Sequence, residues 1–126
     1  MKQAKQVRHE LLLELVAFSI LVTSVVLLWR NNPLLLSVMV VECLVALLFW
    51  HDPLDVSFFL IIAVLGSLAE LVFVRFGVWR YSNPTFLGIP LWFPWAFGTT
   101  GLIGARLART MVGLWEQRRA LRVSEE

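Results

Sequence analysis

The sequence predicts an all-α polytopic membrane protein with four transmembrane helices arranged as two antiparallel hairpins. Of its 126 residues, 59% are hydrophobic, and the mean hydropathy is +0.77, whereas soluble domains are roughly 45 to 50% apolar. A spanning helix needs about 20 predominantly apolar residues. Four segments approach that length: residues 11–29, 33–50, 54–76 and 90–112.

Helix boundaries are marked at the two short connections between the first three segments. Asn32 followed by Pro33 is typical of a helix N-cap and first turn, and Asp52, Pro53 and Asp55 repeat the pattern. Because both connections are short, we expect each to join antiparallel neighbours. The first segment exceeds a signal-peptide core of roughly 7 to 15 residues, so we expect it to be a retained helix.

The distribution of basic residues predicts the orientation in the membrane. Four spans place eight of the eleven Lys and Arg residues on the side of both termini, and cytoplasmic segments carry the excess of these residues. We therefore expect a multi-pass protein of the cell membrane, the inner membrane in a bacterium, with both termini cytoplasmic. Residues 113–126 should form a basic cytoplasmic helical tail near anionic headgroups.

Several function classes are disfavoured by composition. The net charge is only +2 and the basic residues lie mainly near the ends of the chain, which does not indicate nucleic-acid binding. The single Cys43 permits no internal disulfide. No phosphate loop, catalytic triad or metal-ligand spacing is present. We therefore expect no cofactor, no metal and no nucleic-acid partner.

Small residues follow one face of each of the last two segments. They are Ala63, Gly66 and Ser67 in one and Ala96, Thr100, Gly104 and Ala108 in the other. Such stripes allow close helix packing in lipid, either within one bundle or between two copies of the chain. A similarity between "WRNNP" (29–33) and "WRYSNP" (79–84) fits either an internal duplication or ordinary turn chemistry.

Two acidic residues inside the apolar segments need a physical explanation. Ionisable groups are costly in a membrane and often mark functional sites. Glu42 and Glu70 each lie about 9 to 14 Å along the helix from the outer surface, so they can occupy similar depths. Arg75 and Arg80 are the expected counter-charges, with Arg80 folding back over Glu70. A structural role for either glutamate, through hydrogen bonds to neighbouring helices, stays open.

Residues 76–95, "FGVWRYSNPTFLGIPLWFPW", form the most unusual stretch. The last helix begins either at Pro90, with a kink at Pro94, or at Pro94, leaving non-helical chain at the membrane edge. Either version places Trp79, Tyr81 and Trp92 around an outer-leaflet cleft above the glutamates, a ligand site or simply an aromatic belt. Glu14 and Arg30 should snorkel from helix ends, and Arg106 should anchor at the headgroups.

The motif containing Glu70, Gly77, Trp79, Tyr81, Leu87, Gly88 and Pro90 resembles a turn found in small uncharacterised four-helix membrane proteins. More distantly, it is similar to carotenoid-biosynthesis membrane proteins of the hydratase and lycopene-cyclase kinds. The resemblance implies an isoprenoid-like substrate and a carboxylic acid that protonates an alkene, with Glu70 as the candidate. The cyclase type carries acidic residues after the proline, where this chain has Leu91, Trp92 and Phe93.

Three functions therefore remain as hypotheses. The first is binding of a membrane lipid or an isoprenoid- or carotenoid-like molecule under the loop, by Glu42, Glu70, Arg75, Trp79, Arg80, Tyr81 and Trp92. The second is an accessory subunit of a larger membrane complex, or a homo-oligomer. The third is a membrane enzyme of isoprenoid metabolism that uses Glu70 as an acid.

Overall fold

The fold is all-helical, as predicted. The computed structural model describes residues 2–126 and contains the helices α1 (Lys2–Leu28), α2 (Asn32–Phe49), α3 (Pro53–Arg75) and α4 (Phe93–Glu125). Outside them, the described chain has a single isolated bridge, between Phe86 and Ile89, and no strand. Helices α1, α2 and α3 are long and apolar enough to cross a membrane.

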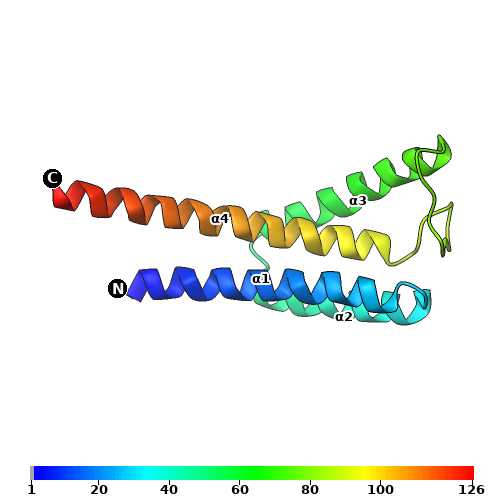
Figure 1. The fold of residues 1–126 in the computed structure, drawn as a ribbon, viewed down its shortest axis with the longest axis horizontal. Coiled ribbons are helices and arrows are strands. Elements are labelled where there is room, and N and C mark those ends of the chain that lie inside the picture. The colour runs from blue at the N-terminus through cyan, green and yellow to red at the C-terminus, as the bar shows by residue number, and fades with distance from the viewer. Residues whose placement is uncertain (1) are drawn as a thin grey trace.

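Two helices extend beyond the rest of the bundle. The charged start of the chain belongs to α1, and α4 continues without a break through the basic tail to Glu125. Figure 1 shows the start of α1 and the end of α4 lying beside each other, past the turn that joins α2 to α3. Both termini therefore lie at the same end of the molecule.

Helix α4 is the central element of the fold. It packs against α1, α2 and α3, and α1 also packs against α2. Eight of its residues are buried, among them Thr99, Leu102 and Ile103. Unlike the other three, α4 lacks an apolar stretch of spanning character.

The expected pairing of α2 with α3 is not found. Helix α3 makes its extensive contact with α4 and diverges from α1 and α2 in Figure 1. Glycines account for this pairing: a Cβ on Gly98 would lie 2.7 Å from the Phe59 ring, and one on Gly101 would lie 2.6 Å from Ile62. Gly104, in the predicted stripe, has open space around it. The face of α4 that contacts α3 is therefore rotated about the helix axis from the face predicted from Ala96, Thr100, Gly104 and Ala108.

Helix caps follow the predicted chemistry with one shift. Asp52 caps α3, and Asp55 Oδ2 accepts a hydrogen bond from the backbone N–H of Asp52 at 3.2 Å. For α2 the N-cap is Asn31 rather than Asn32, and its side chain accepts from the N–H of Leu34. The shift makes Asn32 the first helical residue and frees its side chain for contacts with the distant loop.

The connection between α3 and α4 is non-helical over residues 76–92. Helix α4 begins at Phe93 with Pro94 in its first turn. Of the two predicted starts, Pro90 and Pro94, the structure therefore has the later one. The chain turns at Gly77 and at Leu87 and Gly88, all with positive φ. Glycine adopts this conformation at little cost, and at Gly88 a Cβ would also approach the Val74 side chain to 2.6 Å.

Candidate functional site

The loop between α3 and α4 closes over Glu70 through two aromatic side chains. Trp79 Nε1 and Tyr81 Oη both donate to Glu70 Oε2, at 2.8 and 2.6 Å. Glu70 is 9% exposed and lies one turn before the end of α3. Its position explains its burial, because the loop returns directly across the end of its own helix.

Arg80, the expected partner of Glu70, does not close over it. Arg75 and Arg80 are exposed, and neither forms an ion pair within residues 2–126. Side chains two residues apart point the same way when the chain is extended. Trp79 and Tyr81 can therefore face Glu70 together while Arg80 faces outward. This arrangement could have been predicted from the sequence, because Trp79, Arg80 and Tyr81 are consecutive.

The space expected to form a cleft beneath the loop is filled by core side chains. Ile89, Trp92 and Phe93 are buried there against Leu35 and Met39. The Tyr81 ring packs edge-on against Phe93 with centroids 5.4 Å apart. Trp92 is thus a core residue whose indole N–H donates to Asn32 Oδ1 at 3.2 Å. The loop is a packed cover at this end of the bundle.

The two similar stretches, residues 29–33 and 79–84, contact each other. Asn32 donates through its side-chain amide to the backbone carbonyl of Asn83, at 2.6 Å. Asn83 donates in return to the carbonyl of Trp29, at 3.1 Å. These reciprocal bonds fasten the α3–α4 loop to the α1–α2 turn.

Tyr81 supplies a pH-dependent test of this closure. Burial, followed by the hydrogen bond to Glu70 and the Glu70 charge, raises the pKa of Tyr81 well above its ordinary value of 10.0. Above pH 10 the unfolded chain loses the phenolic proton while the folded chain keeps it, so stability falls as pH rises through this range. Tyr81 is the only tyrosine, so phenolate absorbance reports it directly.

We expect no phenolate absorbance near pH 10 in the folded protein in detergent, and an ordinary titration after denaturation. Glu70→Gln should move the folded-state transition toward lower pH. Titration of folded wild-type protein near pH 10 would contradict the closed loop.

Glu42 lies in a different environment from Glu70. Ser24 of α1 donates to Glu42 Oε1 at 2.5 Å, whereas Oε2 is buried without a partner. The carboxyl borders a groove of about 260 Å³ formed by α1, α2 and α4. We call this the Glu42 groove. Its walls are Leu13, Val16, Ala17, Ile20, Val41, Val45, Ala46, Phe49, Trp50, Thr99 and Ile103.

An ionic cluster holds α4 to the α2–α3 turn at the end of the bundle where the termini lie. Arg106 pairs with the fully buried Asp55 and with Asp52, the latter at 3.1 Å. Arg109 lies 3.0 Å from Asp52 and 3.7 Å from Asp55. Arg106 is therefore engaged within the protein, in contrast to the headgroup anchor expected for it.

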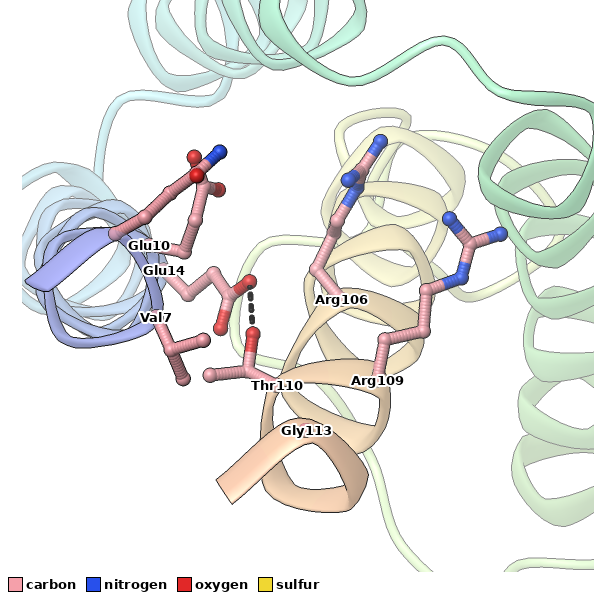
Figure 2. Close-up of a pocket in the computed structure, with 8 residues that line it drawn as sticks. Val7, Glu10, Glu14, Arg106, Arg109, Thr110 and Gly113 are labelled. Carbon is pink, nitrogen blue, oxygen red and sulfur yellow. Dashed lines mark hydrogen bonds between the residues drawn. The ribbon is translucent and has the colours of Figure 1, made fainter. Parts of the chain in front are cut away.

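Glu14 is also buried, in contrast to the snorkelling side chain expected for it. It is 1% exposed, and Thr110 of α4 donates to its Oε1 at 2.8 Å. Figure 2 shows this bond at a cleft between α1 and α4, with Glu10 nearby and both arginine side chains directed away from Glu14. Glu14 Oε2 has no partner.

These features define a class: an all-helical protein with three helices long enough and apolar enough to cross a membrane, and buried carboxyl groups at four separate places. No family model matches the chain, and neither a curated protein nor a solved structure is significantly similar to it.

Proposed function

We propose that the protein crosses the membrane four times and binds one chain of a lipid or isoprenoid-like molecule in the Glu42 groove. The four-span arrangement is supported by the packing of α4. Helix α4 lies along three neighbours, each long and apolar enough to span, so it crosses with them. The eight basic residues at the end with the termini then favour a cytoplasmic location for that end.

The observation that carries the binding proposal is the unpartnered Oε2 of Glu42 at the edge of an apolar groove. A buried polar atom without a partner is costly, by about 1 to 3 kcal/mol. A ligand hydroxyl or other donor that reached Oε2 would remove that cost. The apolar walls would hold the attached hydrocarbon chain, as ligand pockets with few polar groups do.

The size of the groove limits what it holds. Its volume of about 260 Å³ is just below the range of roughly 300 to 1,000 Å³ typical of small-molecule pockets. It therefore suits one hydrocarbon chain with a polar end rather than a whole two-chain lipid. The groove lies in the half of the bundle nearer Trp50 and Leu13, which is the inner leaflet in this topology, and not beneath the α3–α4 loop.

The geometry of Glu70 favours a structural role over acid catalysis. One of its oxygens accepts two hydrogen bonds, and core side chains pack beneath the covering loop. A substrate alkene would have to displace Trp79 or Tyr81 to reach it.

Glu42→Leu separates ligand binding from a purely structural role of Glu42. After the change the single hydroxyl proton of Ser24 can be donated to the carbonyl of Ile20, 2.8 Å away, and an apolar side chain lies in an apolar groove. We expect stability to be maintained while retention of the ligand falls by about tenfold, which corresponds to the loss of one hydrogen bond. Native mass spectrometry of the protein in mild detergent measures retention, and fragmentation identifies the bound class. A loss of stability with unchanged retention would show that Glu42 is structural.

A further inference from the structure

We propose that the cleft between the start of α1 and the end of α4 binds a primary alkylammonium group, the chemistry of an aminophospholipid headgroup or of a soluble amine. This site is distinct from the Glu42 groove and does not depend on it. Its central residue is Glu14, and the cleft has a volume of about 320 Å³.

The charge of the cleft favours a cation. Arg106 and Arg109 border it, but their guanidinium groups pair with Asp52 and Asp55 on the far side. Figure 2 shows both guanidinium groups directed away from Glu14. Glu14 and Glu10 form no ion pair within residues 2–126. The two carboxyls that line the cleft thus have no ion-pair partner, although two arginines also line it.

Hydrogen-bonding capacity favours an ammonium group over a bare metal ion. Across the described chain no three His, Cys, Asp or Glu side chains are placed to hold a metal. An alkylammonium has three N–H donors, and the buried, unpartnered Glu14 Oε2 is an acceptor for one of them. Glu10, one turn earlier on the same face of α1, and the Gln6 side-chain carbonyl can take the others. Val7 and Gly113 line the cleft where the carbon atoms of the ligand would lie.

The position of the cleft suits a headgroup. The cleft lies near the α2–α3 turn, because Arg106 and Arg109, which line the cleft, both pair with Asp52, the N-cap residue of α3. In the proposed topology this is the inner surface of the membrane, where aminophospholipid headgroups are found.

The test compares phosphatidylethanolamine with phosphatidylcholine, which share phosphate and acyl chains but differ in the three N–H donors. A preference that arose at the Glu42 groove would persist in Glu14→Gln, so that variant separates the two sites. The full-length protein is equilibrated with equimolar amounts of both lipids in mixed micelles, and the bound lipids are counted by native mass spectrometry. We expect wild-type protein to retain the ethanolamine lipid about tenfold over the choline lipid, the value of one charge-assisted hydrogen bond.

Glu14→Gln should abolish the preference, and Glu10→Gln should reduce it. The matched control is Glu125→Gln, which makes the same change at an exposed position at the end of α4 and should leave the preference intact. If Glu14→Gln does not fold, Glu10→Gln decides the result. Equal retention of the two lipids by wild type, together with no binding of free ethanolamine, overturns the proposal. An unchanged preference in the two cleft variants also overturns it.

A second arm identifies the source of the amine. Free ethanolamine is titrated against protein in phosphatidylcholine alone. Binding of free ethanolamine without a lipid preference supports an amine site for a soluble ligand. A lipid preference that millimolar free ethanolamine does not displace supports a headgroup site.

Discussion

Replacing Asp55 by asparagine is expected to lower the free energy of unfolding by about 3 kcal/mol, the lower end of the range for breaking a buried ion pair. Asp55 is fully buried and pairs with Arg106 and Arg109. The neutral side chain would leave Arg106, whose side chain is 19% exposed, with only the more exposed Asp52. Equilibrium unfolding in mixed micelles, followed by tryptophan fluorescence, measures the change.

Asp52→Asn is the matched control for this prediction. The Asp52 side chain is 57% exposed, and exposed ion pairs contribute only about 0 to 1 kcal/mol. The same chemical change three residues away should therefore have a small effect. Equal effects of the two substitutions would mean that the cluster is solvated and that Asp55 does not hold α4 to the α2–α3 turn.

Gly101→Ala is expected to destabilise the protein by about 1 to 3 kcal/mol, the cost of overpacking a close contact. A Cβ at this position would lie 2.6 Å from Ile62 Cβ and 3.0 Å from the backbone oxygen of Phe58. The backbone of α3 cannot yield as a flexible side chain can, so α3 and α4 must separate. The same unfolding measurement checks this result.

The opposite sign is expected for Gly104→Ala, one turn further along α4. Nothing lies within 4 Å of a Cβ at that position, so the variant should gain about 0.5 to 1 kcal/mol from helix propensity alone. Stabilisation by both substitutions would contradict the α3–α4 contact at Gly101. Destabilisation by Gly104→Ala would instead favour a contact with a second copy along the predicted stripe.

The number, order and approximate bounds of the helices could be predicted because they depend on local chemistry. Apolar segments, prolines and cap residues act within a few positions along the chain. The cap of α3 at Asp52 follows this logic. The shift of the α2 N-cap from Asn32 to Asn31 does not depend on local chemistry alone, because Asn32 forms hydrogen bonds to the Asn83 carbonyl and to Trp92. Those partners lie 51 and 60 residues away.

The arrangement of helices and the partners of the buried charges could not be predicted in the same way. The contact between Glu14 and Thr110 joins residues 96 apart, and nothing local marks Thr110 as its partner. Glu14 lies near an apparent helix end, which suggested snorkelling, whereas α1 and α4 extend together and enclose it. The pairing of α3 with α4 depends on which face of α4 meets α3. Gly98, Gly101 and Gly104 lie on different faces of α4, and the sequence does not show which of these faces contacts α3.

The Glu42 groove is tested most directly by filling it. Ala17 lines the groove, and Ala17→Phe should occupy the space of the ligand chain, whereas Ala69→Phe adds the same side chain at an exposed position of α3. Native mass spectrometry of each protein from mild detergent counts the bound apolar molecules. We expect Ala17→Phe to carry one bound molecule fewer than wild type and Ala69→Phe. Equal numbers of bound molecules on wild type and on Ala17→Phe would contradict ligand binding in the groove.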